Sequence, residues 1–486
     1  MKVKVLSFTI VWFKSFQINY IDSMTSQQVI DVLEKAMRAM QVNGVEYADI
    51  LYQSTDGIQI VKRKTREDVL TPPSPYGFVL RVFKGGEWRE ASTYKLDEAR
   101  IMELARKLPN FIPTTKKPVK MKIYDPWQLN QELDVKINSV EVPLEEKMEM
   151  VRQNYGLAKN MDERVVDVQS GYQDRIFEKI VVTSEGSRLR QVIPIVHVGI
   201  WPFVRESGRI EDSYNSVGYT GGYEFAKKMD EEKIRQTVQD AIENLRSTQC
   251  PSGTYRVIMD PGMTGLFTHE SFGHGTEADQ VARGRSYLIP FMGKQMGKEF
   301  VHLVDNGILS NGWGSFFFDD EGVKTQQTYI IENGVLRRFL QDRFTASLLD
   351  KTPTGNARRE SPAKKEYIRM TNTYIEPNNW TFEEMLDSFD GIFVKGGSFG
   401  MEDPAGGEMQ LTAAKGYVIE NGKIARVLSK VAMSGYVPAV IAAIDAISKR
   451  EDVSIRAGMC GKGNEDYVLV GSGGPFIRTE AVVGPG

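Results

Sequence analysis

The chain has 486 residues, of which 41% are hydrophobic, 26% charged and 10% aromatic, and its formal net charge is −3. This length predicts two or three domains with a large apolar core. The near-neutral charge excludes a general attraction to nucleic acid or to an anionic membrane, so neither is an expected partner. With only two cysteines, Cys250 and Cys460, the cytoplasm is the expected location. A single Cys250–Cys460 bridge is the less favoured alternative.

The N-terminus begins like a signal peptide but does not continue as one. Its basic start and short apolar run end at Lys14, and no small-residue cleavage site follows. No later apolar run is long enough to span a bilayer. We therefore expect residues 1–23 to be an N-terminal extension and the first domain to begin at Met24.

The rest of the chain is predicted to be α+β, with N-terminal α/β modules followed by a large strand-rich C-terminal domain. The first block, an α+β domain at 24–125, has helical patterns at 25–40, capped by Ser26, and at 95–108. Its strands are expected at 48–54, 58–63 and 77–83, and a linker at 111–126.

The second block, a central α+β domain at 126–248, is predicted to contain helices at 144–160 and about 226–246. Its strands are expected at 166–172, 178–184 and 191–200. The third block, residues 249–486, begins near Pro251-Ser252-Gly253. It carries two similar segments, 329–340 and 417–428, each with Asn-Gly between apolar strands, which predicts two type I′ hairpins in one large sheet.

One short stretch, F-T-H-E-S-F-G-H-G-T-E-A-D at 267–279, carries the strongest chemical signal. His269 and His274 lie five residues apart, and Glu270 follows the first. On an ideal α-helix, positions five apart are roughly 140° apart and cannot share an ion. A π-bulge would align them, and so would a helix end at Gly273 that turns the backbone.

Chance is a poor explanation for this pair of histidines. The chain has four histidines in total, and a His-acid-x-x-x-His match is expected only about 0.004 times in this composition. Taken singly, each histidine reads as an ordinary buried or capping residue. Taken together with Glu270, they favour a metal site.

A catalytic zinc site usually has three protein ligands, so a third ligand is needed. The candidates are a carboxylate, another histidine or Cys460. His197 and His302 lie in apolar strand patterns and are better interpreted as core or sheet-face residues. Cys460 stands among glycines in A-G-M-C-G-K-G-N, which indicates a tight loop built for close approach, whereas Cys250 is expected to be structural.

This arrangement predicts hydrolysis. A bound metal would acidify a water molecule, and Glu270 would take its proton and pass it to the leaving amine. Glu277 and Asp279 are candidates to orient the imidazoles, as carboxylates commonly do around metals. The alternative, in which both are solvent-facing acids, is equally compatible with the sequence.

Several further motifs carry a resemblance to a known family. The stretch H-E-S-F-G-H-G-T-E-A-D, G-S-F-F-F-D-D-E-G at 314–322, R-M-T-N-T at 369–373 and G-M-C-G-K at 458–462 together resemble the TldD branch of the TldD/PmbA family. The likeness extends over most of the chain after Met24. The partner branch, PmbA or TldE, lacks the H-E-x-x-x-H motif that is intact in this sequence.

The resemblance implies a cytoplasmic zinc-dependent metallopeptidase, with His269, His274 and Cys460 as metal ligands and Glu270 as the catalytic base. It also implies a homodimer or a heterodimer with a TldE/PmbA-type paralogue, acting on unfolded or extended peptides. Zinc is the expected metal, and iron stays open. A strand-rich fold suits such substrates, since an extended peptide can add to a sheet edge near Gly396 or Gly406.

Two other functions are compatible with the same residues. The first is a cysteine hydrolase with Cys460 as nucleophile and His269 or His274 as its base. That reading leaves Glu270 and the second histidine without a role. The second is a non-catalytic peptide-binding scaffold in which the metal is structural or absent.

Overall fold

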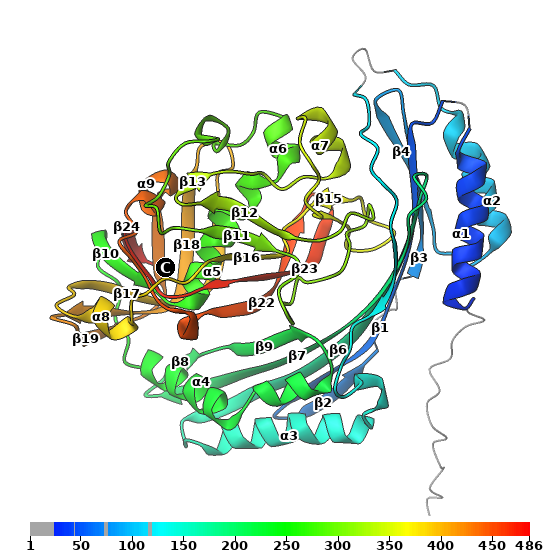
Figure 1. Ribbon diagram of the computed structural model, residues 1–486. Coiled ribbons are helices and arrows are strands. Elements are labelled where there is room, and N and C mark those ends of the chain that lie inside the picture. The colour runs from blue at the N-terminus through cyan, green and yellow to red at the C-terminus, as the bar shows by residue number, and fades with distance from the viewer. Residues whose placement is uncertain (1–23, 43, 72–75, 115–118) are drawn as a thin grey trace, which may run out of the picture.

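The computed structural model describes residues 24–42, 44–71, 76–114 and 119–486 (Figure 1). A long curved sheet carries helices α1–α4 on its outer face, and a strand-rich C-terminal body lies against its inner face. The predicted mixed fold with a strand-rich C-terminal part is confirmed. The expected extension, 1–23, lies outside the described residues. Within those residues, no helix is long and apolar enough to cross a membrane.

Among the residues that the structure describes, nine strands form the curved sheet, in the order β4-β3-β1-β6-β7-β5, with β2 on β1 and β8 and β9 on β7. Because β1 and β6 are neighbours, the first two sequence blocks share one sheet. We propose that the domain boundaries lie after residues 125 and 248. The strands are β1 (Tyr47–Arg63), β2 (Arg66–Leu70), β3 (Tyr76–Lys84), β4 (Glu87–Thr93), β5 (Gln128–Glu132), β6 (Val165–Thr183), β7 (Arg188–Glu206), β8 (Arg209–Asp212) and β9 (Asn215–Thr220).

Two strands of this sheet each join two segments that the sequence pattern predicted as separate strands. The strands expected at 48–54 and 58–63 are the single 17-residue β1, and those expected at 166–172 and 178–184 are the single 19-residue β6. Gly57 does not interrupt β1. A β-carbon at Gly57 would lie 2.1 Å from the carbonyl oxygen of Asp174, so glycine lets β1 and β6 stay in contact there.

The outer helices follow the apolar periodicity of the sequence. They are α1 (Ser26–Met40), α2 (Glu98–Lys107), α3 (Leu144–Asn160) and α4 (Glu231–Asn244). The expected cap of the first helix, Ser26, was wrong. The hydroxyl of Thr25 accepts the N–H of Gln28, and the Gln28 side chain accepts the N–H of Thr25, which forms a capping box. Ser26 instead donates to Glu178 on β6.

The C-terminal body contains two main sheets with α5 (Pro261–Thr268) between them, since α5 contacts β17 of one sheet and β22 and β23 of the other. One sheet has the order β10-β17-β18-β20-β24-β21, with β19 on β18. Its strands are β10 (Gly253–Met259), β17 (Gly391–Glu402), β18 (Glu408–Glu420), β19 (Lys423–Leu428), β20 (Val431–Tyr436), β21 (Ala446–Ile447) and β24 (Ile477–Pro485).

The other main sheet has the order β13-β12-β11-β16-β23-β22, and β14 and β15 form a separate ladder. The strands are β11 (Leu303–Asn306), β12 (Gln327–Glu332), β13 (Val335–Leu336), β14 (Ala357–Arg358), β15 (Tyr367–Ile368), β16 (Asn372–Ile375), β22 (Ser454–Lys462) and β23 (Glu465–Gly474). Short helices complete the body: α6 (Ala278–Ala282), α7 (Arg343–Leu348), α8 (Phe382–Leu386) and α9 (Val437–Ala442).

The two Asn-Gly turns have the predicted backbone but not the predicted location. Asn333 and Gly334, like Asn421 and Gly422, all have positive φ angles, as a type I′ turn requires. The first pair joins β12 to β13 and the second joins β18 to β19, which belong to different sheets. The expectation of one shared sheet was wrong, because a hairpin signal is local and does not specify which strands lie beside it.

Buried ion pairs join the curved sheet to the C-terminal body. Arg81 on β3 donates to Asp49 at 2.8 Å and also pairs with Glu321 and Glu366. All four side chains are nearly inaccessible to solvent. Burial raises the pKa of Glu321 to about 8 even though Arg81 opposes the rise. Arg81 is therefore the ion-pair partner that these three buried carboxyl groups share.

Replacing Arg81 with alanine is expected to destabilise the protein by about 3–5 kcal/mol, because it leaves buried carboxyl groups without their cation. Urea denaturation followed by circular dichroism measures the change. Arg38→Ala, on the exposed face of α1, is the control and should change stability by no more than about 0.5 kcal/mol. Equal stability of the two variants would contradict this account of the interface.

Candidate metal centre

The helix that carries both histidines begins at a strand end. Asp260 follows β10, and its carboxylate accepts the N–H of Met263 at 2.8 Å, which caps α5. After Thr268 the chain continues as a π-helix, His269–Gly273, in which the N–H of His274 donates to the carbonyl of His269. This is the i→i+5 turn that the spacing predicted as one of two possibilities.

Gly273 is required by the packing around this turn. A β-carbon at Gly273 would lie 1.8 Å from the sulfur of Met370, a fully buried side chain. The φ angle of Gly273 is −53°, so the constraint here is space and not backbone strain. Glycine therefore lets the π-helix lie directly on Met370.

The structure brings His269, His274 and Cys460 together. The sulfur of Cys460 is 3.1 Å from Nε2 of His269 and 3.3 Å from Nε2 of His274. Potential ligand atoms of the three side chains all lie within 4.8 Å of one another. His269 and Cys460 are buried, whereas His274 is partly exposed. The cluster therefore sits at the boundary between core and solvent.

Cys460 reaches the cluster from a strand and not from the tight loop that its glycine neighbours predicted. It lies in β22, paired with Val468 of β23, and the register shifts between Cys460 and Lys462. At the shift, a β-carbon on Gly461 would lie 2.9 Å from the carbonyl of Glu465. The glycine thus serves a bulge in the hairpin, which re-aims the side chains beside it.

Charged side chains surround the cluster and fix its orientation. Oε2 of Glu277 is 3.3 Å from Nδ1 of His274 and 2.9 Å from the ammonium group of Lys462. Burial would raise the pKa of Glu277, but Lys462, His274 and Arg369 lower it to about 2. Glu277 thus occupies the orienting position expected for it. Asp279 does not, since its partner is Lys462 at 2.8 Å, and that expectation was wrong.

Arg369 and Lys462 were missed as site residues, although both lie in motifs that carried the family resemblance. Arg369 is fully buried, 3.5 Å from Glu277 and 3.0 Å from Glu465. Its guanidinium also donates to the carbonyl of Gly461, next to Cys460. The available signal was a basic residue in each of two family motifs, and neither motif indicates which carboxylate that residue contacts.

The sulfur of Cys460 lies in a field that favours the thiolate. Burial raises the pKa of Cys460, but the two imidazoles, led by His269, lower it to about 5. The pKa of His274 is raised well above its ordinary value, because Glu277 and Cys460 outweigh burial. A thiolate is the form in which cysteine binds a metal or acts as a nucleophile.

Glu270 points toward β17. A β-carbon on Gly400 would lie 2.4 Å from Cγ of Glu270, so the strand passes directly against this side chain. Glu402, two residues further along β17, has both carboxyl oxygens buried and, in the described part of the chain, without a hydrogen-bond partner. Burial, together with Glu277 and Glu270, raises the pKa of Glu402 to about 9, although His274 opposes the rise. No sequence feature had marked Glu402.

The other histidines and the second cysteine lie elsewhere. His197 is on the inner face of β7 against the ring of Trp313, and burial lowers its pKa to about 4. His302 accepts the N–H of Asn333. Cys250 is buried and donates to the carbonyl of Pro251, and both cysteines are free thiols. The expectations of structural roles for His197, His302 and Cys250 agree with these contacts.

The donor set suits a zinc ion. Two imidazole nitrogens and one thiolate are ligands that zinc prefers, and tetrahedral zinc would place nitrogen and sulfur about 3.6 Å apart. The two N···S distances, 3.1 and 3.3 Å, need to open by only a few tenths of an ångström. His274 is held through its other nitrogen by Glu277, as metal-bound histidines commonly are.

Known proteins are similar to this chain over almost its whole length. Models of the PmbA/TldA metallopeptidase central domain and C-terminal domain match residues 137–248 and 252–483. A metalloprotease of Methanocaldococcus jannaschii is 33% identical over 459 residues, covering 93% of this chain and 99% of its own. A zinc metalloprotease TldD homologue of Saccharolobus solfataricus is 27% identical, covering 92% and 98%. TldE from Thermococcus kodakarensis shares the fold, with a TM-score of 0.76, 17% identity and coverage of 94% and 100%.

The chain is therefore a metallopeptidase and belongs to the PmbA/TldD family. Within that family it falls in the TldD branch, in agreement with the H-E-x-x-x-H motif at 269–274.

Adding a methyl group at Gly273 tests the packing of the π-helix. Gly273→Ala is expected to destabilise the protein by about 1–3 kcal/mol, although alanine is the better helix former, because the methyl collides with Met370. Thermal and urea unfolding measure the effect. In a Met370→Ala background, Gly273→Ala should lower the free energy of unfolding only slightly or should raise it. An equal cost in both backgrounds would show that Met370 is not the obstacle.

Proposed function

We propose that this metallopeptidase uses zinc to hydrolyse unfolded or extended peptides, with His269, His274 and Cys460 as the metal ligands and Glu270 as the base. The observation that carries the proposal is the convergence of the three donor atoms where the π-helix meets β22. The zinc named for the Saccharolobus solfataricus relative supports the choice of metal.

Zinc held by these ligands would supply Lewis acidity and a water molecule whose pKa falls to about 7. The protein's own groups divide the remaining work. Glu270 follows the first ligand on the same turn, so its carboxylate accepts the proton of the attacking water and delivers it to the leaving amine. Glu277 holds His274 through Nδ1 and leaves Nε2 free as a ligand atom.

An extended substrate has a strand edge available beside Glu270. In the described part of the chain, residues 396–402 of β17 pair with β18 alone, because β10 pairs only with 392–394. The side chains of Phe399 and Met401 are more than half exposed there. A peptide added to this edge is bound through main-chain hydrogen bonds, which give affinity without sequence readout. Gly400 lets β17 itself lie directly against Glu270, so a peptide on this edge would be near that carboxylate.

We further propose that the protein works in the cytoplasm as a homodimer or as a heterodimer with a TldE/PmbA-type paralogue. The two free thiols support a reducing compartment. The fold shared with TldE over 94% of the chain supports a paralogue of the same shape as partner.

The cysteine-hydrolase alternative has one observation in its favour. The thiolate-forming field around Cys460 and the imidazole nitrogen 3.1 Å away are also what a nucleophilic cysteine needs. A cysteine hydrolase gives no role to Glu270. Its peptide cleavage should also survive removal of the metal, whereas that of a metallopeptidase should not.

Glu270→Gln is expected to lower the rate of cleavage of an unfolded protein such as reduced casein by about 10²–10⁴-fold, because the proton acceptor is lost. Zinc content, measured by mass spectrometry, should not change. The matched control is Glu420→Gln, at the exposed end of β18. Normal cleavage by Glu270→Gln would contradict the proposed role of Glu270 and would favour the cysteine hydrolase.

Chelation is expected to abolish peptide cleavage, and added zinc to restore it. Cys460→Ser should lower zinc content and activity together, because a thiolate ligand is lost, whereas Cys250→Ser should retain both. Iodoacetamide should modify Cys460 faster after chelation than before. Activity that survives complete metal removal, but not alkylation of Cys460, would favour the cysteine hydrolase.

A further inference from the structure

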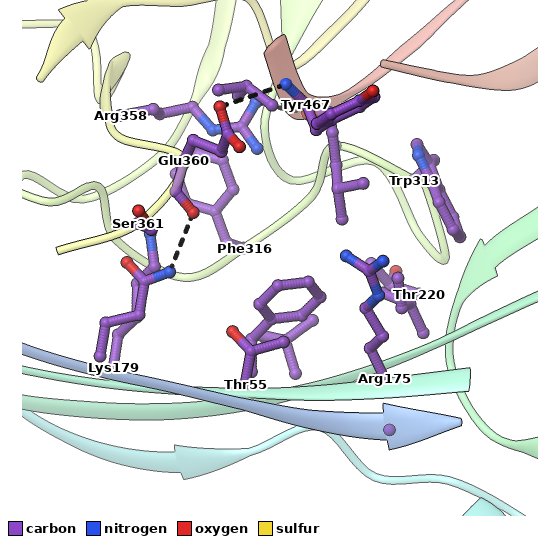
Figure 2. Close-up of a pocket in the computed structure, with 18 of the residues that line it drawn as sticks. Thr55, Arg175, Lys179, Thr220, Trp313, Phe316, Arg358, Glu360, Ser361 and Tyr467 are labelled. Atoms are coloured by element: carbon purple, nitrogen blue, oxygen red, sulfur yellow. Dashed lines mark hydrogen bonds between the residues drawn. The ribbon is translucent and has the colours of Figure 1, made fainter. Parts of the chain in front are cut away.

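A cavity of about 680 Å³ lies between the inner face of the curved sheet and the C-terminal body (Figure 2). Strands β1, β6 and β7 form its floor, and β22, β23 and the loops around Trp313 and Glu360 form the opposite wall. Met459 of β22 lines this cavity, whereas the next residue, Cys460, belongs to the metal cluster. Since successive side chains of a strand point to opposite faces, the cavity is separate from the metal centre.

Arg175 supplies an uncompensated positive charge on the cavity floor. Figure 2 shows its side chain rising from the sheet toward Trp313. Burial lowers the pKa of Arg175, and no carboxylate offsets the effect. With the Gln173 amide turned so that its oxygen faces Arg175, that oxygen accepts from the guanidinium at 2.6 and 2.7 Å. Within the described residues, the guanidinium of Arg175 thus hydrogen-bonds to a neutral amide and not to a carboxylate.

The other cations that line the cavity are already engaged. Lys179 forms an ion pair with Asp320, and Arg359 pairs with Glu90 at 2.7 Å. Arg358 donates to the carbonyls of Met370 and Leu469 at 2.7 and 2.6 Å and lies over the ring of Phe316. Arg175 is thus the cation positioned to take a carboxylate from outside, and Nη1 is the guanidinium nitrogen that the Gln173 amide does not engage.

The opposite wall offers an anion. Oε2 of Glu360 accepts the N–H groups of Asp466 at 2.7 Å and Tyr467 at 3.4 Å. In the described part of the chain, Oε1 of Glu360 has no hydrogen-bond donor, so it can accept one. Figure 2 shows Glu360 across the cavity from Arg175. The two charges face a space lined by aromatic rings: Phe177, Trp313, Phe316 and Tyr467.

We propose that this cavity binds a short peptide with two free termini and an apolar side chain, its carboxylate on Arg175 and its ammonium group on Glu360. The volume is in the range of roughly 300–1,000 Å³ that is typical of small-ligand sites. The aromatic rings contact the apolar side chain. A peptidase releases molecules of this kind, so the site is placed to hold a product. This site is formed by the cavity's own residues and is independent of the roles proposed for Glu270 and the metal.

Calorimetric titration of the dipeptide Ala-Phe into the full-length, metal-loaded protein tests the proposal, with probe integrity checked by chromatography. Ala-Phe should bind at least about ten-fold more tightly than Ala-Phe-amide or N-acetyl-Ala-Phe, because each analogue lacks one charged contact. Metal removal should leave this binding unchanged, since the cavity lies on the other face of β22. These comparisons need no protein variant.

Arg175→Gln should weaken Ala-Phe about ten-fold and abolish the preference for the free carboxylate, and Glu360→Gln should abolish the preference for the free amine. Arg235→Gln, on the exposed face of α4, is the matched control and should bind like the wild type. The proposal is overturned if Ala-Phe does not bind at millimolar concentration or if the blocked analogues bind equally well. Binding that is lost on chelation but kept in Arg175→Gln would assign the dipeptide to the metal centre instead.

Discussion

The candidate metal centre depends on one backbone hydrogen bond, from the N–H of His274 to the carbonyl of His269. In a regular α-helix these residues would face in directions about 140° apart, and no single ion could contact both. The i→i+5 turn aligns them, and the sulfur of Cys460 then lies within 3.3 Å of each ring. The turn is possible because Gly273 leaves room for Met370 beneath it.

The charges around the cluster are better understood as positioning devices than as sources of stability. Removing Glu277, Arg369, Lys462 and Glu465 from water is costly, and buried ion pairs rarely repay that cost in full. What the pairs provide is a fixed relation between two segments nearly two hundred residues apart. Lys462 and Arg369 both reach Glu277, which holds His274, and both lie beside the bulge that follows Cys460.

The sequence predicted those parts of the site that are local or rare. Two histidines in one hexapeptide, with a glycine before the second, allow only two geometries for a shared ion, and the structure shows one of them, the π-helix. The helices and the two type I′ turns are local as well, which explains their success. Cys460 was singled out by its glycine neighbours, although those glycines serve a bulge and not a loop.

What could not be predicted depends on contacts between distant segments. Arg369, Lys462 and Glu402 have no periodicity or spacing that assigns them a partner, and only the packing of β17 and β22 against the π-helix does so. Asp279 was a candidate to orient an imidazole or to face solvent, but it pairs with Lys462 of β22. The prediction that the two Asn-Gly hairpins share one sheet failed in the same way. A turn specifies the two strands that it joins, but it does not specify which other strands lie beside them.

The central claim is that the π-helix and β22 place two imidazoles and one thiolate around a single zinc ion. X-ray absorption spectroscopy at the zinc edge of the purified protein tests it most directly. The account predicts two nitrogen ligands near 2.0–2.1 Å and one sulfur ligand near 2.3 Å, roughly the distances typical of protein zinc sites. A spectrum without a sulfur ligand, or one left unchanged by Cys460→Ser, would contradict it.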